Sequence, residues 1–241
     1  YRYLPHDCMD RLPIMRHPPE NTREFKKDIE EVVRCHSQPS MSTSFLKNTD
    51  DSVEDVFKSY CHENGYKNIN WKKIKDMLND VDTIVLKLKY DNNRPRPIHY
   101  LRDTDHDLSV KYKKSPSFPS GHTAIAYFLC DVLSNSIPEI SQDLQTLASL
   151  IGQTRIENAV HYPTDIEYGR LVGETLASML NDEESGNIDK NLSRKHYKNF
   201  AKKLRSKNIN HDDACHQLAY FLKRTSDIEK FYLDYDNCFE A

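Results

Sequence analysis

Residues 117–138 read SFPSGHTAIAYFLCDVLSNSIP, and this stretch decides the fold. A proline-containing start gives way after Gly121 to an apolar run over residues 124–130. This run is too short for a membrane span, which needs about 18 apolar residues or more. Because proline disfavours helix at the residue before it, the helix should end before Pro138. The stretch therefore predicts a helix that begins after Gly121 and is not a membrane anchor.

Helical periodicity dominates the rest of the chain, and clear strand alternation is hard to find. Glycine is rare, with 6 among 241 residues. The sequence therefore predicts an all-α helical bundle, with an extended arm over residues 1–20 and loops over 36–50 and 90–120. The other predicted helices run from Asn21 or Thr22 to Cys35, from Ser52, from Trp71 to Lys89, from Leu144 to Asn158 and from Pro163 to Leu180.

The length suits one domain with an appendage. We expect residues 1–180 to form the main domain and residues 181–241 to form a helical extension that packs on it. No signal peptide is visible in the sequence. Because the chain begins at Tyr1 rather than at a methionine, the sequence leaves open whether a signal peptide preceded it.

The amino-acid composition limits which classes of function are plausible. Hydrophobic residues make up 37% of the chain, charged residues 29%, and the net charge is −3. Such a balance gives no overall attraction to nucleic acid, and the basic stretch 194–207 is interpreted as a solvated helix face. The six cysteines include no C-x-x-C pair, so they permit disulfides without requiring them. Cys130, inside the apolar run, is predicted to be a buried thiol.

Three clusters carry the chemistry. The first is Lys89 followed seven residues later by Arg96 and a proline, and Lys87 with Arg94 offers the same spacing. Arginine supplies planar paired donors for phosphate oxygens, and lysine supplies a point charge. Taken alone, this cluster is equally compatible with two surface cations beside a loop.

The second cluster is Pro119-Ser120-Gly121-His122 at the predicted helix start. Free backbone N–H groups at a helix N-terminus bind anions, and glycine lets a ligand approach the backbone closely. Ser120 offers a hydroxyl, and His122 is a candidate for proton exchange beside the anion. A simple capped helix start is the plainer interpretation.

The third cluster is Arg155, His161 and Asp165. If a helix begins at Pro163, Asp165 lies in its first turn and can accept a hydrogen bond from His161. That bond would fix the tautomer of the ring and make its other nitrogen a better nucleophile. An isolated His–Asp pair is more often purely structural.

The three clusters together resemble the signature K-x6-RP, PSGH, SR-x5-H-x3-D of the PAP2 superfamily, which includes the class A bacterial acid phosphatases. Members of that class often read R-x-R-P in the first cluster, as residues 94–97 do here, which favours Lys89 and Arg96 over Lys87 and Arg94. Thr154 stands where the signature has serine. The match spans residues 89–165, and the chain beyond 180 matches nothing recognisable.

The resemblance implies a phosphatase with three catalytic residues: His161 as nucleophile, Asp165 as its orienting partner and His122 as acid and base. It implies that phosphate is held by five further residues, namely Lys89, Arg96, Ser120, Gly121 and Arg155. We expect hydrolysis of phosphomonoesters of small soluble substrates through a phosphohistidine, with no metal or other cofactor and with vanadate as an inhibitor. The partners expected are the phosphorylated substrate and inorganic phosphate, without nucleic acid or membrane, and a homo-oligomer stays open.

Other interpretations remain. The vanadium haloperoxidases resemble this superfamily and hold vanadate with the same residue types, but their chains are usually much longer. Membrane lipid phosphatases carry several transmembrane helices. A non-catalytic phosphate-binding module would need the cations but not the His161–Asp165 pair. The resemblance favours a periplasmic or secreted protein, and the lack of a visible signal peptide leaves the cytoplasm open.

Overall fold

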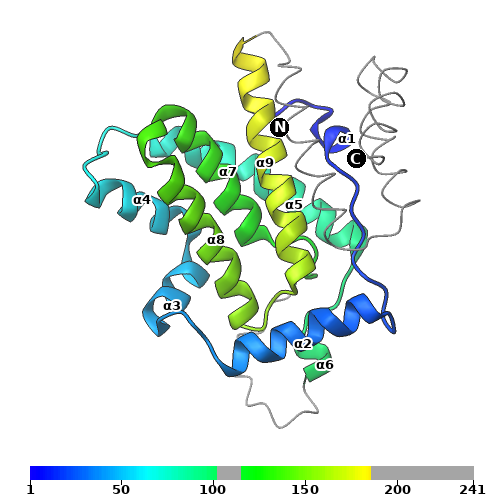
Figure 1. Ribbon diagram of the computed structural model, residues 1–241. Helices are drawn as coiled ribbons and strands as arrows, with labels where there is room; N and C mark the ends of the chain where they lie inside the picture. The colour runs from blue at the N-terminus through cyan, green and yellow to red at the C-terminus, as the bar shows by residue number, and fades with distance from the viewer. Residues whose placement is uncertain (102–114, 186–241) are drawn as a thin grey trace, which may run out of the picture. The chain divides into compact units, whose positions relative to one another are not determined.

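The computed structural model describes residues 1–101 and 115–185 (Figure 1). Every regular element in these ranges is helical, which confirms the predicted all-α class for them. Residues 1–12 and 16–181 form one compact unit. The helices are α1 (Cys8–Arg11), α2 (Arg23–Ser37), α3 (Thr43–Asp51), α4 (Val53–Glu63), α5 (Trp71–Asn92), α6 (Ile98–Leu101), α7 (Gly121–Ser136), the 3-10 helix η1 (Pro138–Ile140), α8 (Ser141–Glu157) and α9 (Pro163–Ser185).

Polar side chains set where the helices begin. Thr22, Ser42, Ser52, Asn70 and Ser120 each precede a helix and accept a hydrogen bond from a backbone N–H of its first turn. This satisfies one of the donors that a helix start leaves unpaired. The predicted helices after Thr22, Ser52 and Gly121 are confirmed within a few residues.

The loop predicted over residues 36–50 is wrong in its second half, because α3 occupies Thr43–Asp51. This helix is short and polar, so it lacks an apolar stripe that would reveal it. Ser42 caps it, and the hydroxyl of Thr49 donates to Thr154 Oγ1 on α8 at 3.1 Å. Two further corrections concern single turns: α1 interrupts the arm predicted over 1–20, and α6 lies within the predicted loop 90–120.

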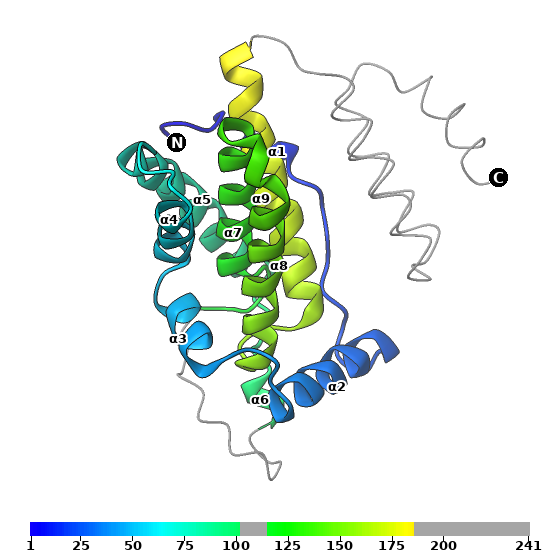
Figure 2. The same ribbon diagram turned by 60° about the vertical axis from the view of Figure 1, so that its left-hand side comes forward.

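Helix α7 forms the centre of the bundle. Half of its residues are buried, from Thr123 to Leu133, and it contacts α4, α5 and α8. Figures 1 and 2 both show α7, α8 and α9 running alongside one another, with α2 crossing near the end of α8. None of the described helices combines the length and the apolar character that a membrane-spanning helix needs.

Two glycines allow α9 to pack directly on the backbone of α7. A Cβ atom on Gly169 would lie 2.5 Å from the carbonyl oxygen of Ser120, and one on Gly173 would lie 2.3 Å from that of Ala124. A step of four residues along α9, from Gly169 to Gly173, matches a step of four residues in the same direction from Ser120 to Ala124. Helices α7 and α9 therefore run parallel. The backbone N–H of Ser120 also donates to the carbonyl oxygen of Asp165 at 3.0 Å. The N-terminal ends of the two helices therefore lie together.

Four cysteines, Cys8, Cys35, Cys61 and Cys130, are buried free thiols. The prediction for Cys130 is thus confirmed, with 1% of the residue exposed. Cys215 and Cys238, the basic stretch 194–207 and most of the predicted extension 181–241 lie outside the described residues.

Candidate active site

The end of α5 and the loop after it, the start of α7, and the connection from α8 to α9 meet around one cavity. Its volume is about 350 Å³. Six of the eight candidate residues line it, and Ser120 and Asp165 are fully buried beside these residues. The lining residues are Asp82, Val85, Leu86, Lys89, Arg96, Ser115, Gly121, His122, Ile125, Arg155, Val160 and His161.

The connection between α8 and α9 positions His161. Both Val160 and His161 direct their backbone N–H to the carbonyl oxygen of Arg155, at 3.2 and 3.3 Å. Ala159 turns the chain with a φ of 50°, in the left-handed region that residues other than glycine rarely adopt. Such a conformation persists only where the surroundings enforce it, and Ala159 is fully buried. This turn presents the imidazole to the cavity.

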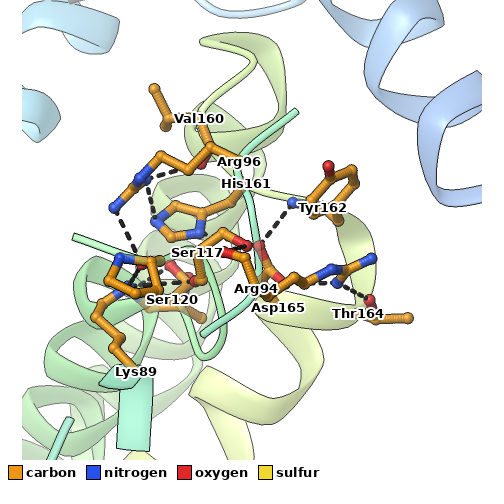
Figure 3. Close-up of polar contacts among 12 residues, drawn as sticks. Lys89, Arg94, Arg96, Ser117, Ser120, Val160, His161, Tyr162, Thr164 and Asp165 are labelled. Atoms are coloured by element: carbon orange, nitrogen blue, oxygen red, sulfur yellow. Dashed lines mark hydrogen bonds and ion pairs between the residues drawn. The ribbon is translucent and has the colours of Figure 1, made fainter. Parts of the chain in front are cut away.

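His161 lies between Asp165 and Arg96 (Figure 3). Its Nδ1 is 3.1 Å from Asp165 Oδ2, and its Nε2 is 3.3 Å from Arg96 Nη1. A guanidinium can only donate, so Nε2 acts as the acceptor and the ring proton sits on Nδ1, where the carboxylate accepts it. Nε2 is therefore unprotonated when this ring is neutral, and its lone pair faces the guanidinium of Arg96.

Burial, together with the positive charges of Arg96, Lys89 and Arg155, lowers the pKa of His161 well below its ordinary value. This shift favours the neutral imidazole. Burial raises the pKa of Asp165, and the ion pair with Arg94 and the backbone N–H of Tyr162 oppose that rise. The pair is an unprotonated nitrogen base held by a buried carboxyl group.

Lys89 and Arg96 form one wall of the site. Lys89 Nζ donates to the carbonyl oxygens of Pro116 and Ser117, at 2.8 and 3.2 Å. Arg96 is fixed by the carbonyl oxygens of Ser115 and Val160, each at 2.8 Å. Burial and the neighbouring guanidinium of Arg96 lower the pKa of Lys89 to about 7, and burial lowers the pKa of Arg96 to about 10. A bound anion would stabilise the charged forms of both side chains.

Arg155 has spare donors. Its Nη2 pairs with Asp50 Oδ1 at 2.7 Å, but Nε and Nη1 are buried without a hydrogen-bond partner among the described residues. An unsatisfied buried donor costs about 1–3 kcal/mol, and more when charged. A guanidinium that lines a cavity with two unused donors is suited to bind an anion there.

The structure distinguishes the two alternative pairs of the first cluster. Lys87 is exposed, pairs with Asp91 at 2.8 Å and is not among the residues that line the cavity. Arg94 is buried beside the site, where its Nη1 donates to Asp165 Oδ1 at 2.6 Å and its Nη2 to Asp28 Oδ2 at 2.7 Å. Only Lys89 and Arg96 line the cavity.

At the start of α7, Gly121 and His122 line the cavity, whereas Ser120 caps the helix through Thr123 N at 3.4 Å. The sequence predicted that the Ser120 side chain contacts phosphate. In the structure Ser120 is fully buried within the first turn of α7 and is not among the residues that line the cavity. His122 Nε2 lies 3.4 Å from the carbonyl oxygen of Asp50. The two histidines thus reach the cavity from different elements, His122 from the start of α7 and His161 from the connection between α8 and α9.

Sequence reasoning missed three groups that complete the site: Asp28 on α2, Asp50 on α3 and the hydroxyl of Thr164. Thr164 Oγ1 accepts from Arg94 at 2.7 Å and donates to Asp28 at 2.5 Å, and together they anchor Arg94. Asp28 and Asp50 lie far from the three clusters in sequence and have no recognisable spacing, whereas Thr164 lies inside the third cluster at a position that the signature leaves open. Only the partners of the buried cations, once known, could have revealed them.

Comparison with known proteins bears on this arrangement. Residues 78–181 match the model of the PAP2 superfamily. A non-specific acid phosphatase of Salmonella typhimurium is 30% identical over 137 residues, which cover 53% of this chain and 54% of that protein. An acid phosphatase of Zymomonas mobilis is 23% identical over 206 residues, which cover 79% of this chain and 76% of that protein.

Two solved structures are also similar to this chain, each with a TM-score of 0.48. A transmembrane PAP2-type phosphatidylglycerolphosphate phosphatase from Bacillus subtilis is 18% identical and covers 70% of this chain and 90% of its own. LpxE from Aquifex aeolicus is 23% identical and covers 65% of this chain and 95% of its own. The matched segment spans about half of the first relative, with 54% of its length. Residues 78–181, which include every residue that lines the cavity and both histidines, are thus the part of this chain that matches the PAP2 superfamily.

Proposed function

We propose that this protein is a metal-independent phosphatase that hydrolyses phosphomonoesters of small soluble substrates through a phosphohistidine at His161. One observation carries the proposal: His161 presents an unprotonated Nε2 to a cavity that three buried cations also line. The names of the relatives, acid phosphatase and non-specific acid phosphatase, support this substrate class.

Binding would place the phosphoryl group against the cations. Arg155 Nε and Nη1 have no other partner among the described residues, so they are suited to two non-bridging oxygens. Lys89 and Arg96 would supply further positive charge, and the N–H of Gly121 lies at the start of α7. Such fixed donors stabilise the charge of a transferring phosphoryl group, and each is worth on the order of 3 kcal/mol.

In the first chemical step, His161 Nε2 attacks phosphorus with its lone pair, and the bond from phosphorus to the leaving oxygen breaks. His122 in its protonated form would donate a proton to that oxygen, so that a neutral alcohol departs. Asp165 accepts the Nδ1 proton in a hydrogen bond and stabilises the positive charge that develops on the ring.

In the second step, neutral His122 would remove a proton from a water molecule, and the hydroxyl oxygen attacks phosphorus. The bond between His161 Nε2 and phosphorus breaks, inorganic phosphate leaves, and both histidines return to their starting states. The first step needs an unprotonated His161 and a protonated His122, which gives a bell-shaped dependence of rate on pH.

Lys89, Arg96 and Arg155 provide the charge that Mg²⁺ provides in other phosphoryl-transfer enzymes, so we expect activity without added metal. Vanadate should act as a competitive inhibitor because it can take up the geometry of the transferring phosphoryl group in the same cavity.

The test is hydrolysis of 4-nitrophenyl phosphate in excess EDTA by the wild type, a His161→Ala variant and a His62→Ala variant. His62 is an exposed histidine on α4 and serves as the matched control. We expect the wild type and the control to turn over equally and His161→Ala to be inactive. Rapid quenching after mixing with a 32P-labelled substrate should trap an acid-labile, alkali-stable phosphoprotein in the wild type and in the His62→Ala control but not in His161→Ala.

Dependence on a divalent metal, or turnover by His161→Ala, would contradict the proposal. Bromide oxidation by peroxide in the presence of vanadate, without phosphate release, would favour the haloperoxidase interpretation instead.

A further inference from the structure

The face of α5 that lines the cavity carries four residues at helical spacing: Asp82, Val85, Leu86 and Lys89. Residues three, four and seven positions apart share one side of a helix, so the four form a continuous stripe. Seven residues correspond to about 10 Å along the helix axis. The stripe therefore joins the phosphate end of the cavity, at Lys89, to a carboxylate at its other end.

Asp82 differs from the other acidic side chains of α5. Asp76 pairs with Arg2, and Asp91 pairs with Lys87. Asp80 accepts the backbone N–H groups of residues 2–4. Within the described part of the chain, no hydrogen bond or ion pair engages Asp82, which is exposed to solvent.

The surrounding protein nonetheless raises the pKa of Asp82, with partial burial as its cause. A carboxylate that loses some hydration without gaining a partner is destabilised in the empty cavity. A cation or a hydrogen-bond donor on a ligand would relieve that cost. Asp82 is therefore suited to bind a cation or a hydrogen-bond donor that the described residues do not supply.

The region between the two charged ends is apolar. Val85 and Leu86 line it from α5, and Ile125 lines it from α7. Leu86 is 49% exposed, which leaves apolar surface available to a ligand. From the phosphate end outward, the cavity thus presents cations, then aliphatic side chains, then one carboxylate.

We propose that Asp82 is a specificity-determining residue that binds an ammonium group on the leaving group, so that the preferred substrates are phosphomonoesters carrying an ammonium beyond a short aliphatic spacer. This inference rests on the proposed function, because it assigns the leaving-group side of the same cavity. It also implies discrimination against substrates with a second phosphate at that end, since Asp82 repels it.

Binding tests the subsite without any turnover. Calorimetry would compare ω-aminoalkylphosphonates of two to six carbons with alkylphosphonates in which a methyl group replaces the ammonium. These probes match in length and cannot be hydrolysed. We expect the amines to bind the wild type more tightly than their isosteres at one or more chain lengths. Asp82→Asn should lower that ratio of affinities by a factor of up to about five, the upper end for an exposed ion pair.

Asp91→Asn is the matched control, because it removes the same charge from the same helix away from the cavity. It should leave the ratio unchanged. Asp82→Lys should reverse the preference and favour an alkane bisphosphonate over the amine. The corresponding phosphates, assayed by phosphate release, should show the same order in kcat/KM.

Equal effects of Asp82→Asn and Asp91→Asn would overturn the inference, because they would indicate only a change of overall charge. An unchanged ratio in Asp82→Asn would overturn it as well. If the phosphonates bind with the expected ratios but no phosphate is released from any ester, the subsite stands and the proposed function fails.

Discussion

Arg94 connects two buried carboxylates and provides a direct test of how His161 is held. Its guanidinium is 2% exposed and pairs with Asp165 at 2.6 Å and with Asp28 at 2.7 Å. Its carbon Cζ also lies 3.8 Å from the centre of the Tyr162 ring. Arg94→Met keeps an unbranched side chain against that ring and removes the charge, so both carboxylates would be left buried without their cation.

The expected cost follows from this geometry. Removing one partner of a buried ion pair costs about 3–5 kcal/mol, because the other charge stays buried without compensation. For a domain of this size, that loss lowers the melting temperature by about 6–20 °C. Without its ion pair, Asp165 would have a still higher pKa, since burial would no longer be opposed. At acidic pH the protonated carboxyl would orient His161 poorly, and kcat should fall.

Urea unfolding followed by circular dichroism measures the first effect, and kcat with 4-nitrophenyl phosphate from pH 4 to 8 measures the second. Arg170→Met is the matched control. Arg170 pairs with Glu174 at 2.6 Å and lies over Tyr127, but its side chain is 35% exposed. An exposed pair contributes about 1 kcal/mol or less. Adding Asp28→Asn to Arg94→Met should restore part of the lost stability, because it removes one orphaned charge.

Equal stability of Arg94→Met and Arg170→Met would refute the reasoning about burial. Loss of stability with an unchanged kcat and an unchanged pH profile in the folded fraction would refute the link from Arg94 through Asp165 to His161.

Two further predictions concern packing and pH. Gly173→Ala places a Cβ 2.3 Å from the carbonyl oxygen of Ala124 and should destabilise by about 1–3 kcal/mol. Gly152→Ala places its closest contact at 2.9 Å, on the side-chain atom Cγ2 of Ile166 rather than on backbone, and should cost less; urea unfolding of the two variants checks this. Lys89, with a pKa of about 7, is charged below that pH and neutral above it, so kcat/KM should fall as pH rises through 7, and Lys89→Arg should move that limb to higher pH. The unfolded chain binds this proton up to about pH 10, so the contribution of Lys89 to stability should increase from pH 7 to 10, which unfolding at several pH values would show.

The sequence could predict the elements that have strong local signals. The helix after Gly121 has an apolar run and a cap, and the order of three clusters indicated which residues surround the cavity. The sequence did not predict helix α3, because its polar residues stabilise it through single contacts rather than through an apolar stripe. One such contact joins Thr49 to Thr154. The sequence did not predict the roles of Asp28 and Asp50, because each is paired with an arginine more than 60 residues away in sequence.

The parallel packing of α7 and α9 determines where each charge in the site can be placed. Each helix carries a macrodipole with about half a positive charge at its N-terminus and half a negative charge at its C-terminus. Helices α5 and α8 end at the cavity, and each carries a cation in its last turn, Lys89 and Arg155. Helix α9 begins there with Asp165 in its first turn, while α7 begins with no acidic residue and offers its N-terminal end to the cavity. The polarity of the helices thus assigns the cations to two of them and the carboxylate to a third, and leaves the start of α7 to attract an anion.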